Sequence, residues 1–94
     1  MVIAMAGEYG VYVIEIEGLE DSLYVGQSFH PAEKRLQQHL DGVRASKWVR
    51  DYGGNLRPDL YEHLPRLDRE GAEALEAIVA ELLRREGWTV YGGH

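Results

Sequence analysis

Two runs of strand-forming residues near the N-terminus, joined by a turn, constrain this chain more than any other feature. Residues 10–17 are rich in branched and aromatic side chains and alternate with acids toward their end, as a strand does. Residues 18–22 have turn composition, and residues 23–26 form a second apolar run. A loop of roughly five residues between such runs predicts an antiparallel hairpin.

The size and composition of the chain limit what can be added to this hairpin. Its 94 residues suffice for one small domain, which we expect to span residues 1–94. A hydrophobic share of 45% and a charged share of 28% exclude a disordered tail, a collagen-like repeat and a coiled coil. The absence of cysteine excludes disulfides and a thiol nucleophile. The apolar run at residues 1–6 is too short for a secretory or membrane segment, so we expect a soluble, cytoplasmic protein with no membrane partner.

Two short helices are predicted after the hairpin. Pro31 suits the first helical position, and Asp41 with Gly42 can end this helix. The stripe expected to face the sheet consists of Ala32, Leu36 and Leu40. Ser46 can cap the second helix, which Gly53 ends. The residues expected to point inward from it are Trp48, Val49 and Tyr52.

A weak strand and a long helix complete the predicted order. Residues 56–64 alternate weakly and contain Pro58, so they form at best a short edge strand. Asp68 is a plausible cap for a helix that runs to about Arg85 and stops at Gly87. Its expected buried stripe consists of Ala72, Leu75, Val79, Leu82 and Leu83, with Ile78 at the edge.

Glu76 lies at the border of that stripe, about 80° from its middle on a helical wheel. A carboxylate in such a place is partly desolvated and favours a cation, either an arginine or a metal ion. For a single glutamate at a boundary, a salt bridge to a neighbouring helix is the common outcome, so the helix pattern leaves both alternatives open.

The charge of the chain is unevenly distributed. The formal net charge is −6, which by itself argues against a polyanionic partner. Residues 1–26 hold five acids and no base, and residues 70–94 hold five acids and two bases. Residues 27–69, in contrast, hold eight bases and six acids. The middle of the chain can therefore present a locally positive field.

The order of several residues resembles a GIY-YIG nuclease domain. The tripeptides Gly10-Val11-Tyr12 and Tyr24-Val25-Gly26 are followed by Arg35 and, on the last predicted helix, by Glu76. Residues 33–40 and 71–79 resemble the first helix and the acidic helix of that family. The resemblance covers about residues 10–85, nearly the whole chain.

This resemblance implies an α/β sandwich of the α+β type, with a three-stranded antiparallel sheet flanked by helices in the order β-β-α-α-β-α. It also implies an endonuclease that hydrolyses phosphodiester bonds in DNA with one divalent metal ion, Mg²⁺ or Mn²⁺. Tyr12 would act as general base or orient the attacking water, and Tyr24 would support it. Arg35 would bind the scissile phosphate, Glu76 would be the sole protein ligand of the metal, and His39 would lie near the site.

The chemistry of this set is consistent in itself. Magnesium prefers oxygen ligands and keeps several waters, so one glutamate with substrate oxygens can complete its shell. Arg35 offers a planar fork that matches phosphate oxygens. Tyr12 and Tyr24 share a face of the sheet only if the sum of paired residue numbers in the hairpin is even. The glycines of the two tripeptides, Gly10 and Gly26, weaken a strand and therefore indicate a close approach or space for a site.

Several of these residues also have a purely structural interpretation. The tyrosines could instead form a cross-strand aromatic pair, and Arg35 could be an exposed helix residue. Trp48 and Trp88 lie among apolar neighbours and are predicted to belong to the core rather than to stack on bases. The histidines show no pairing at helical spacing, which makes a zinc site unlikely. Further phosphate contacts are expected from the basic residues Lys34, Arg44, Lys47 and Arg50.

Two departures from the family pattern favour a second hypothesis. No asparagine follows Asn55, and Gln27 occupies a position where the family often has lysine. A domain with so little basic surface should bind DNA weakly, so a protein partner or a homodimer would supply affinity. The alternative function is therefore a module of this fold that binds nucleic acid or a protein without cleaving.

Overall fold

The structure is a computed structural model that describes residues 7–93; the apolar run at residues 1–6 and His94, both of which figured in the predictions, lie outside the described part. Within it the elements are β1 (Gly10–Ile16), β2 (Ser22–Ser28), α1 (Ala32–Leu40), α2 (Lys47–Tyr52), β3 (Gly54–Leu56), the 3₁₀ turn η1 (Pro58–Leu60), α3 (Arg69–Arg85) and β4 (Thr89–Gly92). Among residues 7–93, no helix is long and apolar enough to span a membrane.

The strands form one mixed sheet in the order β3-β1-β2-β4. β1 pairs antiparallel with both β2 and β3, which confirms the predicted hairpin and an edge strand. That edge strand was predicted within residues 56–64 but lies at Gly54–Leu56, because Pro58 begins a 3₁₀ turn.

The prediction of a purely antiparallel sheet of three strands was wrong in detail. β4 adds a fourth strand at the free edge of β2 and runs parallel to it. A parallel pair needs a long crossover connection, and here α3 lies between the hairpin and β4 in the chain. The strand at Thr89–Gly92 is short, so its sequence alone gave too weak a signal to place it beside β2.

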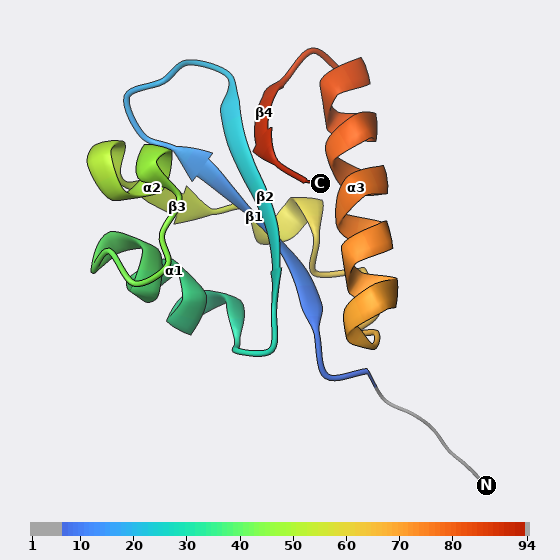
Figure 1. The fold of residues 1–94 in the computed structure, drawn as a ribbon. Coiled ribbons are helices and arrows are strands. Elements are labelled where there is room, and N and C mark those ends of the chain that lie inside the picture. Colours follow the sequence, from blue (N-terminus) through green and yellow to red (C-terminus); the bar gives the residue numbers. More distant parts are fainter. Residues whose placement is uncertain (1–6, 94) are drawn as a thin grey trace, which may run out of the picture.

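The two faces of the sheet are covered by different helices, and the fold is therefore an α+β sandwich (Figure 1). Odd-numbered residues of the hairpin, such as Val13 and Val25, pack with Val79 and Leu83 of α3. Even-numbered residues, such as Tyr12 and Ile14, pack with α1 and α2 on the other side. The alternation follows from the period of two in a strand.

The helices are rotated relative to the predicted stripes. In α1, His39 is fully buried while Leu40 is exposed, so the inward row is Ala32, Leu36 and His39. Tyr52 of α2 is likewise exposed rather than inward. Neighbouring residues of a helix point about 100° apart, so contacts with the sheet decide which of two neighbours faces inward.

The same rotation occurs in α3, with consequences for its glutamate. Leu82 and Ile78 are exposed, whereas the buried row comprises Ala72, Glu76, Val79, Ala80 and Leu83. Glu76 was predicted to border the buried stripe, but it lies within it and is only 7% exposed.

Most signals that begin and end the helices were predicted correctly, but Pro31, predicted at the first helical position, precedes α1 with a ψ of 149°. The Ser46 side chain accepts a hydrogen bond from the Trp48 amide, and the Asp68 side chain accepts one from the Gly71 amide. Gly53 follows α2 with a φ of 83°, a left-handed conformation that glycine adopts without strain. These interactions are local in the chain, so they are readable from short segments.

Candidate active site

Tyr12 occupies the middle of the hairpin, directly opposite Gly26. Its side chain is 2% exposed, and a Cβ atom built on Gly26 would lie 2.5 Å from the phenol oxygen. Gly26 therefore makes room for the Tyr12 ring, which explains this glycine of the motif. The paired residue numbers have an even sum, so Tyr24 shares the face of Tyr12, and their ring centroids are 6.3 Å apart.

Gly10, the glycine of the first tripeptide, makes room for a different side chain. A Cβ atom at Gly10 would lie 2.9 Å from a guanidinium nitrogen of Arg66. Arg66 donates hydrogen bonds to the backbone oxygens of Glu8 and Phe29, which ties the start of β1 to the end of β2. Gly10 thus supports the hairpin rather than the phenols.

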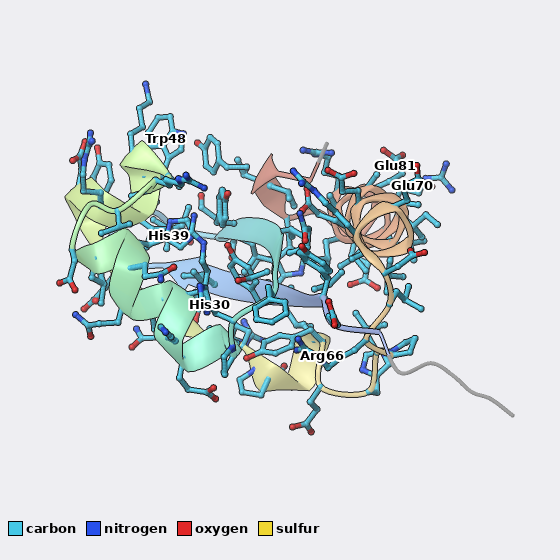
Figure 2. The ribbon with its side chains drawn as sticks, turned by 60° about the horizontal axis from the view of Figure 1, so that its bottom comes forward. His30, His39, Trp48, Arg66, Glu70 and Glu81 are labelled. Carbon is cyan, nitrogen blue, oxygen red and sulfur yellow. The ribbon has the colours of Figure 1, made fainter. Side chains whose placement is uncertain are left out.

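His39 lies in the helical layer (Figure 2). Its ring contacts the rings of Tyr12 and Tyr24, with centroids 6.1 Å and 5.1 Å away. Its Nε2 atom lies 2.9 Å from the Tyr12 hydroxyl, and its Nδ1 atom accepts a hydrogen bond of 2.9 Å from the Ser46 backbone amide. A backbone amide can only donate, so Nδ1 carries no proton and the neutral ring carries it on Nε2. His39 therefore donates to the oxygen of Tyr12, and the Tyr12 proton is left for another acceptor.

The protonation state of His39 agrees with this geometry. Burial, and after it the positive charge of Arg35, lowers the pKa of His39 to about 4. The ring is consequently neutral at pH 7 and has no lone pair available for a proton from water. His39 is placed to orient Tyr12, not to accept a proton.

Both phenols are harder to ionise than a free tyrosine. Burial, followed by the proximity of Tyr24, raises the pKa of Tyr12 above its ordinary value, and Glu76 adds to this effect. Burial and then the Glu76 carboxylate raise the pKa of Tyr24. Arg35 acts on both tyrosines in the opposite direction, since a nearby cation favours phenolate. The charges of Arg35 and Glu76 therefore act on both phenols.

Arg35 is held by the loop that follows its own helix. Its Nη1 atom donates to the Gln38 side chain at 3.2 Å and to the Val43 carbonyl at 3.0 Å, and its Nη2 atom donates to the Arg44 carbonyl at 2.7 Å. A guanidinium has five N–H groups, so at most two remain for Tyr12 and for a phosphate. Arg44 presents its carbonyl from a left-handed conformation, with a φ of 46°.

Glu76 lies on α3, which covers the opposite face of the sheet, and its charge raises the pKa of both phenols. A single buried carboxylate fits Mg²⁺ or Mn²⁺ as one protein ligand, because these ions keep waters and bind substrate oxygens as well. No group of three or more His, Cys, Asp or Glu side chains suited to a metal exists among residues 7–93. The donor set therefore fits an ion that takes most of its ligands from substrate and water. It does not fit a site closed by protein ligands alone.

The remaining predicted residues lie outside the cluster. Lys34, Arg44, Lys47 and Arg50 are exposed on α1, α2 and the loop between them. Arg50 forms an ion pair with Asp51, and the Lys47 ammonium group lies over the Trp48 ring. Gln27 points to the α3 side of the sheet, where its amide oxygen is buried without a hydrogen-bond partner among the described residues.

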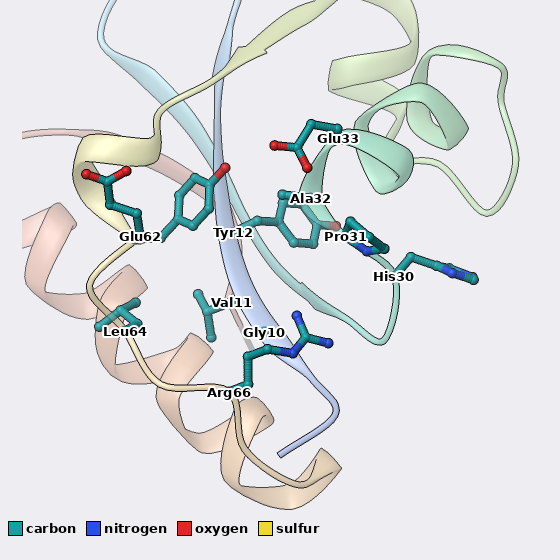
Figure 3. Close-up of a pocket in the computed structure, with 11 residues that line it drawn as sticks. Gly10, Val11, Tyr12, His30, Pro31, Ala32, Glu33, Glu62, Leu64 and Arg66 are labelled. Carbon is teal, nitrogen blue, oxygen red and sulfur yellow. The ribbon is translucent and has the colours of Figure 1, made fainter. Parts of the chain in front are cut away.

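Two features of the site carried no recognisable sequence signal. Ser46 was predicted as a helix cap, but its backbone amide also fixes the tautomer of His39. A hollow of about 260 Å³ beside Tyr12 includes Tyr61, whose pKa is raised by burial and by the charges of Glu33 and Glu62. Figure 3 shows these two glutamates reaching the hollow from opposite sides. Tyr61 lies in the segment predicted as a weak strand.

Comparison of the chain with protein-family models, with curated proteins and with solved structures found no match. The resemblance to the GIY-YIG domain therefore stays a prediction from the sequence.

Proposed function

We propose that the chain is a metal-dependent endonuclease of the GIY-YIG type that hydrolyses phosphodiester bonds in DNA. The observation that carries this proposal is that the buried Tyr12 phenol is hydrogen-bonded to His39, lies 6.3 Å from the Tyr24 ring, and is subject to the charges of Arg35 and Glu76. These groups come from β2, α1 and α3, far apart in the chain. Packing alone gives no reason to bring a guanidinium and a buried carboxylate to two phenols, because buried charge is costly.

The chain's own residues would divide the reaction as follows. Tyr12 would orient the attacking water or, as a phenolate after losing its own proton to solvent, accept the proton of that water. The Nε2–H group of His39 would hold the Tyr12 oxygen in place. Arg35 would bind the phosphate as negative charge develops on it. Glu76 would hold Mg²⁺ or Mn²⁺, which when bound supplies positive charge that acidifies nearby water and phenols.

A nicking assay on supercoiled DNA tests the proposal. With Mg²⁺ or Mn²⁺, the native protein should nick the DNA, and Tyr12→Phe and Glu76→Gln should each reduce the rate by at least about 100-fold. Glu73→Gln is the matched control, because Glu73 is exposed on the same helix. Nicking that survives Glu76→Gln at the native rate would contradict the proposal, as would the absence of any metal-dependent cleavage.

A second candidate is a module of this fold that binds nucleic acid or a protein partner without cleaving it. The observation in its favour is that three N–H groups of Arg35 already bind its own loop and side chain, which leaves few for a phosphate. Calorimetry with Mn²⁺ separates the candidates. Heat of binding that Glu76→Gln removes supports the enzyme, whereas no heat with the native protein supports the module.

A further inference from the structure

A row of aromatic side chains extends from the candidate active site to the surface of the helical layer. Tyr24 pairs in register with Tyr91 across the parallel strands, so the two side chains share a face. The Tyr91 ring stacks on Trp48, with centroids 4.5 Å apart and planes inclined by 27°. Trp48 in turn stacks with Tyr52 at 6.2 Å and 17°. Three stacked rings thus lead outward from Tyr91, the strand partner of a proposed catalytic phenol.

The outer part of this row is accessible to solvent. The side chain of Tyr52 is 48% exposed, and Trp48 and Tyr91 are half-buried. The exposed Lys47 side chain lies beside these rings, with its ammonium group 4.9 Å from the centre of the Trp48 ring. Trp48 was predicted to be a core residue, and it does pack against the core, but only with part of its surface. Figure 2 places it at the margin of the helical layer.

The same layer carries a local excess of positive charge. Residues 32–52, which span α1 and α2, hold five bases and three acids, while the whole chain has a net charge of −6. Nucleic-acid backbones are attracted to such a local excess of lysine and arginine. Aromatic rings beside basic side chains are the combination that binds unpaired strands, because every base has a face that can stack.

We propose that Tyr91, Trp48 and Tyr52 form a stacking platform for unpaired bases, so that the substrate is a nucleic-acid strand that is single-stranded beside the cleaved bond. Bases inside a duplex are stacked on each other and cannot reach a protein ring without leaving the helix. The part of this inference that concerns a cleaved bond rests on the proposed nuclease function. The binding of an unpaired strand to the platform is independent of that function.

The platform is continuous with the candidate active site, which favours a role in binding the same substrate. Tyr24 belongs to both sets, since its ring lies 5.1 Å from the ring of His39 and its strand partner is Tyr91. Gly92 follows Tyr91, and a Cβ atom there would lie 2.9 Å from the Tyr24 ring. The end of β4 therefore holds the two tyrosines in a fixed relation. A strand whose phosphate lies at Tyr12 and Arg35 would pass its next bases over Tyr91 and Trp48.

Fluorescence of Trp48 provides a direct test. In a Trp88→Phe protein Trp48 is the sole tryptophan, and in Trp48→Phe the sole reporter is Trp88, which packs on the α3 side of the sheet. The titrants are a short single-stranded DNA, RNA of the same sequence, and the DNA annealed to its complement. EDTA replaces metal so that no cleavage occurs. Quenching of Trp48 by a single strand, but not of Trp88, is expected.

Variants on the exposed side of the platform keep the test independent of folding. Tyr52→Ala and Lys47→Ala alter exposed side chains, and each should weaken single-strand binding by about tenfold, the effect of losing one stacked base or one phosphate contact. Quenching by DNA alone or by RNA alone assigns the sugar, and either supports the platform. Equal binding of duplex and single strand, or no quenching of Trp48, would overturn it.

The outcomes also separate this inference from the proposed function. Quenching without any metal-dependent nicking would leave the platform standing and remove the nuclease. Metal-dependent nicking with no quenching of Trp48 and no effect of Tyr52→Ala would keep the nuclease and remove the platform.

Discussion

The ring of Tyr12 lies over Gly26, its partner across the hairpin, with the phenol oxygen 2.5 Å from where a Cβ atom of residue 26 would be. This distance is shorter than any normal contact of a methyl group. The glycine thus provides the volume that the ring occupies, and any side chain at that position would displace the phenol from His39. A motif glycine and a motif tyrosine are therefore one packing unit.

Replacing Gly26 with alanine should destabilise the protein by about 1–3 kcal/mol, because the added methyl group overpacks the interior. The cost should largely disappear in a Tyr12→Ala background, where the ring is absent. Urea denaturation of the native protein, Gly26→Ala, Tyr12→Ala and the double variant measures the coupling energy between the two positions. Gly87→Ala is the control, because nothing lies near its Cβ position and its φ of 103° makes the cost purely conformational. An undiminished cost of Gly26→Ala without the ring would contradict the contact.

The stability of the protein should fall as the pH falls from about 6.5 to about 4, because of His39. Its pKa is lowered from 6.5 to about 4 in the folded state, so over this range the unfolded chain takes up a proton that the folded protein does not. The contribution present above pH 6.5 and lost by pH 4 is about 2–3 kcal/mol. Denaturation of the native protein and of His39→Gln across this range gives the difference between their slopes.

The control for that measurement is His63→Gln, which changes an exposed histidine. It should keep the pH slope of the native protein, whereas His39→Gln should flatten the slope. Equal slopes for the native protein and His39→Gln would mean that His39 becomes protonated in the folded state.

Glu76→Gln should make both phenols easier to ionise. The carboxylate charge is the second largest cause of the raised pKa of Tyr24 and the smallest cause of that of Tyr12, so the pKa of Tyr24 should fall more. Since the folded pKa lies above the unfolded value of 10, stability is lost as the pH rises through this region, and the variant should lose less. NMR titration of tyrosines labelled at Cζ measures each phenol. Glu73→Gln should leave the pKa of both tyrosines unchanged. An unchanged pKa of Tyr24 in Glu76→Gln would show that the Glu76 carboxylate does not act on this phenol.

Arg44→Gly should be more stable than Arg44→Ala by about 1 kcal/mol, since only glycine adopts the left-handed conformation of this residue without strain. Both variants remove the same charge, so the difference reports the backbone alone. The Arg44 carbonyl that binds Arg35 is kept in each. Thermal denaturation gives the comparison, and equal stabilities would show that the loop relaxes to another conformation.

Local features of the fold were predictable from short segments of the sequence. The hairpin, the caps at Ser46 and Asp68, and the glycines after the helices all depend on neighbours within a few residues. The members of the candidate site were also named in advance, because their order along the chain resembles a known pattern. Their catalytic roles remain predictions.

Features that depend on distant contacts were not predictable in the same way. The pattern of α1 pointed to Leu40, and the sheet turned His39 inward instead. The row Tyr24, Tyr91 and Trp48 exists only because β4 returns beside β2 after α3.

The amino-acid sequence by itself determined where the chain turns and which segments are helical. Only the tertiary structure decided the register that places two phenols on one face of the hairpin. It also decided that His39 is neutral and donates to Tyr12, that Glu76 is buried, and that an aromatic row leads outward. The physical reason is the distance along the chain over which each interaction acts. Capping and turn formation involve atoms a few bonds apart, whereas burial, protonation and ring stacking depend on which remote segments exclude water together.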